Sequence, residues 1–289
     1  MQSAQIWVAG EALIDLLPNG ESKLPVVGGG PANTAKALSN LGFATSFIGG
    51  ISSDEYGKLI ETELSSYGVD LSGALRSELP TAIAEVELSG SGSASYKFKL
   101  EGTATFAFGE WLPKGDPLVI HVGTLATIME PGASALFEWA SGFSSPIIFD
   151  PNIRSSVLAD RGKYRKQFER WAKIASIVKL SEEDLSWLGY TVDEILNLGP
   201  ELVVLTRGSM GLSGYRAGNR VDVDGVAVEV VDTIGAGDTV GAVIAEGIIN
   251  HGELKGEVLQ LVLQRAAKAA AITCTRAGAK PPNFTELAD

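Results

Sequence analysis

The chain has 289 residues, which is long enough to bury a large core as two average domains or as one α/β domain with an insertion. It carries 23 Lys and Arg against 35 Asp and Glu, and the resulting net charge of −12 argues against nucleic acid or an anionic membrane as a partner. The single cysteine, Cys274, excludes an intramolecular disulfide and fits a reducing compartment. No signal-peptide pattern opens the chain and no apolar run is long enough to span a membrane, so we expect a cytoplasmic protein.

Three glycines, Gly28 to Gly30, precede a predicted helix near the amino-terminal end of the chain. Glycines let the backbone approach a ligand closely, and Pro31 suits the first position of the helix. Asn33 then falls in the first helical turn. Its amide offers two donors and one acceptor to the hydroxyl groups of a ligand, and the alternative is a local capping amide.

The region from Thr81 to Leu100 alternates between apolar and polar residues around the segment Ser89-Gly90-Ser91-Gly92-Ser93. This alternation predicts a β-hairpin and not a β-α-β unit. The hairpin has one apolar face, which must lie on another part of the protein. The residues of this face are Ala84, Val86, Leu88, Tyr96, Phe98 and Leu100.

Four apolar runs without polar alternation predict buried strands of a parallel sheet. They are Leu118 to Val122, Ile147 to Phe149, Ile174 to Leu180 and Leu202 to Leu205. Longer helical patterns separate them, which is the rhythm of β-α-β units. Polar or glycine residues follow each run, in the segments 121–124, 150–152, 179–181 and 206–208. Because open α/β sheets bind ligands outside the carboxyl ends of their strands, we expect these loops to share one cleft.

Two cationic residues near these strand ends are candidates for contact with an anionic ligand. Arg154 follows Asp150, and a guanidinium there can hold an anionic oxygen or stabilise a phosphoryl group in transfer. The alternative is a surface arginine paired with a neighbour such as Asp160. Lys179 can neutralise phosphate charge, and the alternative is a solvated lysine at the end of a strand.

The segment Val231 to Val240 is the most informative part of the chain. The turn Gly235 to Gly237 can offer successive backbone N–H groups to an anion, and a helix predicted from about Thr239 to Asn250 directs its positive end to the same place. Asp238 would then stand where a general base can reach a hydroxyl that attacks a phosphate. The alternative is that Asp238 is only the N-cap of the helix.

Other enzyme classes lack their signatures in this sequence. No G-x-x-x-x-G-K-[ST] pattern occurs, which excludes a P-loop kinase. The spacing of Gly235, Gly237 and Gly241 misses the dinucleotide fingerprint by one residue. His121 and His251 are too far apart, and too poorly supplied with Cys or acidic neighbours, to suggest a zinc site.

The segments Gly28 to Ala35 and Asp232 to Asp238 together resemble the two-part signature of the ribokinase-like (PfkB) sugar kinases. In that family Gly-Gly precedes Asn and Ala at a helix start, and the second motif, D-T-x-G-A-G-D, is matched here at every fixed position. Further similarities extend from Val8 to Pro282. The combination of Gly-Glu-Ala-Leu-Ile-Asp-Leu-Leu-Pro, at 10–18, with Asp-Pro-Asn-x-Arg, at 150–154, is most similar to bacterial fructokinases.

The resemblance implies a fold. It is a three-layer α/β/α core with a mostly parallel sheet, in a single kinase domain over residues 1–289. A small β-sheet, formed by about 12–27 and 80–101, is expected to be a lid that closes over the sugar and excludes water. The alternative is an ordinary edge hairpin that covers part of the core.

The resemblance also implies roles for individual residues. The catalytic set is Asp238 as the base, with Gly235, Ala236, Gly237 and Arg154 at the transferring group. The acceptor-binding set is Asp15, Gly29, Gly30, Asn33 and Asp238. The nucleotide-binding set is Lys179, Thr206, Gly208, Gly211 and Gly237.

Two metal sites follow from the same resemblance. Many relatives carry Asn-x-x-Glu in the loop after the strand of Lys179, where this chain has Ser181-Glu182-Glu183-Asp184. We expect Asp184 to belong to a modified Mg²⁺ site. Relatives often bind K⁺ as well, and the matching positions here are Asp232, Ile234, Arg276 and Gly278, of which only Asp232 would use its side chain.

The sequence therefore predicts an ATP-dependent, Mg²⁺-using sugar kinase that phosphorylates a primary hydroxyl, with D-fructose as the favoured acceptor. Ribose, 2-keto-3-deoxygluconate and a nucleoside stay open as acceptors, because lid residues set that choice. A non-catalytic sugar- or nucleotide-binding protein is the alternative from another class, and Asp238 argues against it because a binder needs no base. An apolar lid face that pairs with its twin would give a homodimer.

Overall fold

The computed structural model describes residues 6–20, 22–88 and 94–288. Its largest element is an eight-stranded sheet with the order β14-β13-β12-β11-β10-β9-β1-β4. The strands from β12 to β4 pair in parallel, whereas β13 and β14 run antiparallel at one edge. Their bounds are β1 Ile6–Ala9, β4 Thr45–Ile48, β9 Val119–Gly123, β10 Ile147–Asp150, β11 Ile177–Ser181, β12 Leu202–Thr206, β13 Leu212–Arg216 and β14 Asn219–Val223.

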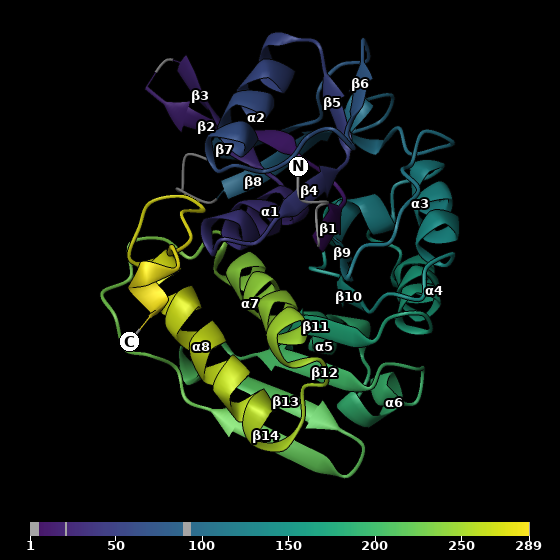
Figure 1. Cartoon of the computed structure of the whole chain (residues 1–289). Coiled ribbons are helices and arrows are strands. Elements are labelled where there is room, and N and C mark those ends of the chain that lie inside the picture. Colours follow the sequence, from purple (N-terminus) through teal and green to yellow (C-terminus); the bar gives the residue numbers. More distant parts are fainter. Residues whose placement is uncertain (1–5, 21, 89–93, 289) are drawn as a thin grey trace.

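Helices cover both faces of this sheet (Figure 1). One face carries α1 (Gly30–Asn40), α7 (Ala236–His251) and α8 (Gly256–Cys274), and the other carries α3 (Gly132–Ala140), α4 (Arg161–Ala172), α5 (Glu182–Leu188) and α6 (Val192–Leu196). Successive strand residues point to opposite faces. Ile148 therefore packs in the core layer of α7 and α8, while Phe149 packs with Trp171 in the layer of α4. The expected three-layer α/β/α fold with a mostly parallel sheet is confirmed.

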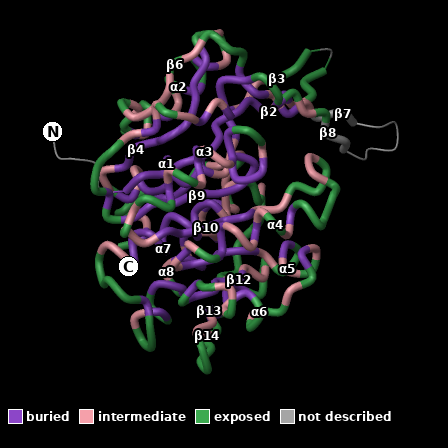
Figure 2. The backbone as a smooth tube through the Cα atoms, turned by 90° about the vertical axis from the view of Figure 1, so that its right-hand side faces the viewer, coloured by how far each residue is buried: buried purple, intermediate pink, exposed green. Residues whose placement is uncertain are grey.

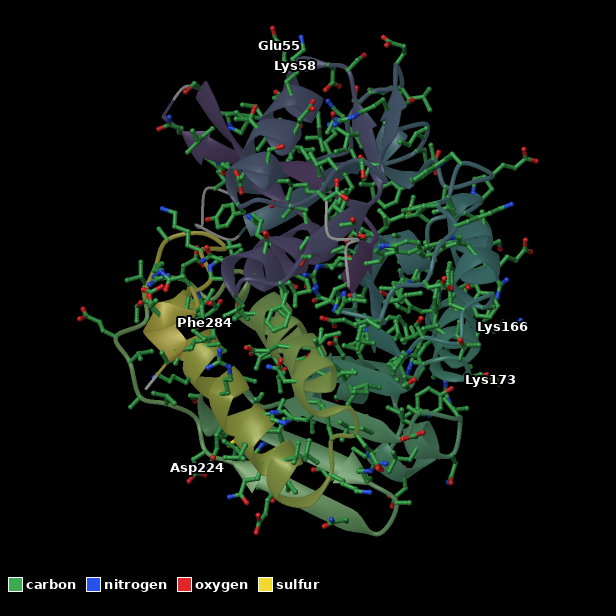
Figure 3. The ribbon with its side chains drawn as sticks, in the orientation of Figure 1. Glu55, Lys58, Lys166, Lys173, Asp224 and Phe284 are labelled. Atoms are coloured by element: carbon green, nitrogen blue, oxygen red, sulfur yellow. The ribbon has the colours of Figure 1, made fainter. Side chains whose placement is uncertain are left out.

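Two lysines mark solvent-facing surfaces of the helices. Lys58 on α2 (Glu55–Ser66) and Lys166 on α4 point outward from the molecule (Figure 3). Over the residues that the structure describes, no helix has both the length and the apolar character needed to cross a bilayer.

The predicted strands lie close to their observed positions, with one clear error. The interpretation of Ile174 as the start of a strand is wrong: α4 ends at Ala172, Ile174 lies in the turn that follows, and β11 begins only at Ile177. Ile174 packs against the core although it is not in the sheet. The apolar residues therefore continue from the turn into β11, and the sequence pattern does not mark where the strand begins. The helix predicted from Thr239 begins one turn earlier, at Ala236.

A second sheet contains four strands in the order β3-β2-β7-β8. They are β2 (Leu13–Asn19), β3 (Ser22–Gly28), β7 (Ile83–Leu88) and β8 (Ala94–Lys99), and β7 and β8 pair antiparallel as a hairpin. The predicted turn at 89–93 lies outside the described residues. Figure 2 shows this small sheet standing out from the body of the molecule, beside the pair β5 (Gly50–Ser52) and β6 (Leu75–Ser77) and the helix α2.

Candidate active site

The amino-terminal ends of α1 and α7 meet above the carboxyl ends of the parallel strands. The Asn33 side chain donates from Nδ2 to Oδ2 of Asp238 at 2.9 Å, and the Thr34 hydroxyl donates to the Asp238 carbonyl at 3.3 Å. The two helices pack side by side (Figure 1). Two motifs that lie 205 residues apart in the sequence thus form one site.

Asp238 lies in the first turn of α7 and is buried, with 7% of its surface exposed. The N-cap of α7 is Gly235, so the interpretation of Asp238 as an N-cap is wrong. Burial raises the pKa of the Asp238 carboxyl to about 6, against the lowering effect of the Lys179 charge and of the Asn33 hydrogen bond. A carboxylate that is desolvated but still ionised at neutral pH is suited to accept a proton.

The turn before Asp238 depends on two glycines. Gly235 has φ +80°, and a Cβ there would lie 2.6 Å from Cβ of Ala279. A Cβ on Gly237 would lie 3.0 Å from Nζ of Lys179. The first N–H groups of α7 have no partners within the helix, and the Lys179 ammonium stands beside them. This combination is suited to bind an anion.

Lys179 forms a buried ion pair with Asp150: Nζ lies 2.7 Å from Oδ2, and the two residues are 4% and 1% exposed. The interpretation of Lys179 as a solvated lysine is therefore wrong. Burial by itself would lower the pKa of Lys179, but the carboxylates of Asp150, Asp238 and Asp184 raise it above its usual value. The second oxygen of Asp150, Oδ1, is buried and has no hydrogen-bond partner in the structure.

Gly30 lies in close contact with three side chains, and no larger residue would fit in its place. A Cβ at this position would lie 2.7 Å from Cγ2 of Thr124, 3.2 Å from Oδ1 of Asp238 and 3.4 Å from Nδ2 of Asn152. Asn33 is buried beside it, and its Oδ1 has no hydrogen-bond partner. The capping interpretation of Asn33 is wrong, because α1 has no side-chain cap and the Asn33 amide reaches across to α7.

Asp15 lies beside the same segment. A Cβ on Gly28 would lie 2.2 Å from Oδ2 of Asp15, and Gly29 has φ +106° with its backbone against the Glu11 carbonyl. Burial raises the pKa of Asp15 to about 6, and the charge of Arg154 lowers it in part. Glycine at position 28 therefore brings the backbone close to the Asp15 carboxylate, and glycine at position 29 brings it close to a backbone carbonyl.

Arg154 extends the site on its exposed side. Its Nη1 donates to Oδ1 of Asn152 at 2.7 Å and to two nearby carbonyls. The expected alternative, a pair with Asp160, does not form, because Asp160 caps α4 by accepting from the Lys163 amide. The charge of Arg154 lowers the pKa values of both Asp15 and Asp238. Its guanidinium thus contributes positive electrostatic potential at both carboxylates.

A cavity of about 650 Å³ separates the small sheet from the core beside Arg154. Its walls come from β8, from the segment after β9 and from the turn that begins at Arg154, whose carbonyl accepts the Val157 amide at 2.9 Å. The lining includes Lys97, Phe98 and Leu100 on the sheet side, with Ile128, Met129 and Leu158 on the core side.

The residues predicted for the nucleotide lie at the end of β12. Thr206 pairs in register with Ser181, the last residue of β11. Gly208 and Gly211 have φ values of +55° and +93°, and a Cβ on Gly211 would lie 2.1 Å from the Val223 carbonyl. The turn between β12 and β13 therefore requires glycine and presents an exposed backbone at Gly208.

Asp184 has a clear structural task. With Ser181 it forms a capping box at the start of α5, and its Oδ1 also accepts the Ile153 amide at 2.9 Å. Asp184 thus ties the loop after β10 to the end of β11. Its carboxylate raises the pKa of Lys179, which places its charge next to the Lys179–Asp150 pair.

Asp232 joins two loops. Its carboxylate accepts the Ile234 amide at 3.0 Å and the Gly278 amide at 2.9 Å. Arg276 donates elsewhere, to Glu286 and to the Pro281 carbonyl at 3.1 Å. Each carboxylate oxygen keeps a free lone pair. Over the described ranges, no cluster of three or more His, Cys, Asp or Glu side chains could hold a metal ion.

Three residues of this site are absent from the predicted sets. They are Glu11, Thr124 and Asp150, all buried. Asp150 and Thr124 did stand out as polar residues just past strands, but nothing in the sequence showed that Asp150 pairs with Lys179 or that Thr124 faces Gly30.

Comparison with known sequences is consistent with this geometry. A family model described as pfkB family carbohydrate kinase matches residues 6–286. A fructokinase from Rhizobium leguminosarum bv. trifolii is 38% identical over 251 residues, covering 81% of this chain and 76% of its own length. A fructokinase from Escherichia coli is 30% identical over 96% of this chain and 95% of its own.

Solved structures give the same result. A fructokinase from Xylella fastidiosa with bound ATP superposes with a TM-score of 0.89 at 26% identity, over 99% of this chain and 97% of that one. A fructokinase double mutant from Vibrio cholerae O395, in a form with fructose, ADP and potassium ion bound, gives 0.84 at 26% identity, over 98% and 94%.

Proposed function

Because the chain belongs to the pfkB family of carbohydrate kinases, we propose that it transfers the γ-phosphoryl group of ATP to the 6-hydroxyl of D-fructose. The observation that carries the proposal is the buried carboxylate of Asp238. Asn33 holds its Oδ2 at the positive end of α7, and its Oδ1 lies beside Gly30. The similarity to fructokinases supports D-fructose as the acceptor.

Each residue then has a role in the transfer. Asp238 accepts the proton of the attacking hydroxyl, and the amides of Gly235, Ala236 and Gly237 stabilise charge on the phosphoryl oxygens. Lys179, held by Asp150 beside Gly237, adds a fixed positive charge on the same side. Arg154 stabilises the transferring group from the exposed side. Because the charges are in place before reaction, the protein has little to reorganise at the transition state.

The acceptor binds between the small sheet and the core. Asp15, Gly29, Gly30 and Asn33 surround the position of the sugar, and the unpartnered Oδ1 of Asn33 is free to accept one of its hydroxyls. The nucleotide phosphates lie toward Lys179 and Gly237, and the exposed backbone at Gly208, in the turn that Gly211 closes next to Thr206, holds the rest of the nucleotide.

Mg²⁺ enters with ATP as part of the substrate and neutralises phosphate charge when bound. The residues present fit this ion, because Asp150 has a buried carboxylate oxygen without a partner and Mg²⁺ prefers hard oxygen ligands. Asp184 lies close to the same charges, with its geometry fixed by the capping box. We assign these two carboxylates to the Mg²⁺ environment.

A K⁺ ion would be held by Asp232 with backbone carbonyls near Ile234, Arg276 and Gly278. The fit rests on the Asp232 carboxylate, which already joins the two loops and keeps free lone pairs. The Gly235 turn begins immediately after Ile234. Such an ion would therefore steady the turn that presents N–H groups to the phosphate.

The small sheet acts as a lid within a single kinase domain. The cavity of about 650 Å³ between β8 and the core supports this role, because any movement of β8 changes access to it. β3 is at the outer edge of the small sheet, and its Leu24 is 49% exposed, which supports pairing of two lids in a homodimer. The lone Cys274 fits the cytoplasm.

An assay of ADP release from Mg·ATP tests the function across a panel of D-fructose, D-ribose, 2-keto-3-deoxygluconate and a nucleoside. D-fructose should give the highest kcat/KM. Another acceptor preferred by about tenfold or more, equivalent to roughly 1.4 kcal/mol, would reassign the substrate. Absence of release with every acceptor, together with measurable sugar binding, would make the protein a non-catalytic binder.

A further inference from the structure

We infer that Thr124 binds a hydroxyl of the acceptor sugar and that Glu11 is the positioning residue that holds Thr124 in place. The inference rests on the proposed function, because it adds two residues to the same acceptor site. It starts from three observations on Thr124: its backbone conformation, its unpartnered hydroxyl and its close contact with Gly30.

The backbone of Thr124 is strained. Its φ is +54°, in the left-handed region, and among the described non-glycine residues only Asn152 shares a positive φ. A β-branched residue rarely adopts this conformation, and such outliers gather at functional sites. Both residues follow the ends of neighbouring strands, β9 and β10, and both face the point where a Cβ of Gly30 would stand.

The hydroxyl of Thr124 has no partner. Thr124 is 4% exposed, and its Oγ1 is buried without a hydrogen bond. A buried hydroxyl that lacks a partner loses the hydrogen bonds that water would give it, so the fold keeps it at a cost. A ligand hydroxyl would recover that bond.

The side chain of Thr124 lies directly against Gly30, next to the carboxylate of Asp238. Cγ2 of Thr124 is 2.7 Å from the point where a Cβ of Gly30 would stand, and Oδ1 of Asp238 is 3.2 Å from that point. Cγ2, and not the hydroxyl, faces Gly30 in this rotamer, and a rotation of about 120° about χ1 brings Oγ1 to the position that Cγ2 occupies. With Oγ1 in that position, the Thr124 hydroxyl would face Gly30 on the side of Asp238 Oδ1, where the acceptor hydroxyl is deprotonated.

Glu11 fixes this arrangement. Its side chain is 2% exposed and accepts the amides of Leu125, at 3.3 Å, and Ala126, at 3.0 Å, which directly follow Thr124. The Thr127 hydroxyl donates to the Thr124 carbonyl at 2.7 Å. The N–H and the C=O of the peptide that follows Thr124 are therefore both held, which fixes the backbone from which the Thr124 side chain projects before the sugar arrives.

The decisive variants are Thr124→Val, which keeps the β-branched shape without the hydroxyl, and Thr124→Ser, which keeps the hydroxyl. Thr124→Val should raise the KM for the acceptor about tenfold and leave the KM for ATP unchanged, because a sugar hydroxyl loses its partner in a closed site. Thr124→Ser should stay within about threefold of the wild type, since a single neutral hydrogen bond is retained. Thr45→Val removes another buried hydroxyl, at the start of β4, and should leave both KM values unchanged.

A double-mutant cycle tests Glu11. Glu11→Gln should raise the acceptor KM and not the ATP KM, and the double variant Glu11→Gln/Thr124→Val should be no worse than Thr124→Val alone, because both changes remove one interaction. Additive losses would show that Glu11 acts elsewhere. If Thr124→Val does not fold, Thr124→Ala replaces it against the same Thr124→Ser rescue.

The proposed acceptor and the proposed role of Thr124 can be disproved independently of each other. The wild-type substrate panel reports on the acceptor, and the valine–serine contrast is measured with the acceptor on which the wild type is most active. Calorimetric titration with that sugar, without ATP, gives the same contrast in binding. An acceptor KM for Thr124→Val within about twofold of the wild type, well under the effect of one lost hydrogen bond, would overturn the assignment whichever sugar is preferred.

Discussion

The amide of Asn33 orients the carboxylate of Asp238. It donates to Oδ2 at 2.9 Å, while Oδ1 lies 3.2 Å from the point where a Cβ of Gly30 would stand. One oxygen is therefore held by Asn33, and the other lies beside Gly30, on the side where we propose that the acceptor binds. This division gives Asp238 one fixed rotamer, which a general base requires for a proton to be transferred along a defined direction.

The activity should depend on the ionisation of Asp238. Burial raises the pKa of its carboxyl from 3.8 to about 6, and a base works only in its deprotonated form. As the pH falls below about 6, kcat/KM for the acceptor should therefore decline by about tenfold per pH unit. Initial rates measured between pH 5 and 8 would show this decline, which is the acid limb of the pH profile.

Asp15 provides the control for that profile, since burial raises its pKa to about 6 as well. The acid limb should persist in Asp15→Asn, with a higher KM for the acceptor. A profile that stays flat from pH 5 to 7 in the wild type would mean that no such carboxylate takes part.

The Lys179–Asp150 pair should show different effects on stability and on activity. Lys179→Met leaves the Asp150 carboxylate buried without its partner and should lower the free energy of unfolding by about 3 kcal/mol. Lys179→Met/Asp150→Asn should recover most of this loss, because position 150 then no longer carries a buried, unpaired charge. Turnover should remain low in both variants, since the positive charge beside Gly237 is absent.

Urea unfolding and steady-state rates on the two variants and the wild type separate these effects. Lys173→Met, on the surface at the end of α4, is the matched control and should change neither quantity (Figure 3). Recovery of turnover in the double variant would show that the Lys179 charge is not used.

The small sheet should respond to the acceptor. Without ligand, amides of β7 and β8 should exchange hydrogen faster than those of β9 and β10, which are buried in the central sheet. Addition of the sugar should slow exchange in β7 and β8, because closure over the ligand removes their freedom to open. Equal protection of these strands with and without sugar would identify them as fixed structure.

The sequence predicted the sheet better than the contacts across it. Buried runs such as Leu202 to Leu205 lack polar alternation, and this property follows directly from being covered on both faces. The start of β11 was misplaced because Ile174 packs into the core from a turn, and apolar character reports burial and not strand pairing. The antiparallel strands β13 and β14 at the edge of the sheet were not predicted from the sequence.

The candidate active site was likewise predictable only where the pattern is local in sequence. Glycine spacing and an acid at a helix start predicted the place of Asp238, because those patterns act locally. The bond from Asn33 to Asp238 spans 205 residues and depends on how α1 packs on α7. The left-handed backbone of Thr124 was also invisible, since a threonine gives no hint of a conformation that it adopts only under constraint.

The most direct test of the account compares Asp238→Asn with the wild type in turnover of D-fructose with Mg·ATP. Asparagine keeps the size of the side chain, and its carbonyl oxygen can accept the Asn33 amide, so the free energy of unfolding should change by no more than about 1 kcal/mol. Turnover should fall by about 10²–10⁴-fold, with the affinity for fructose changed far less. A folded variant that retains more than about a tenth of the wild-type kcat would contradict a general-base role for Asp238.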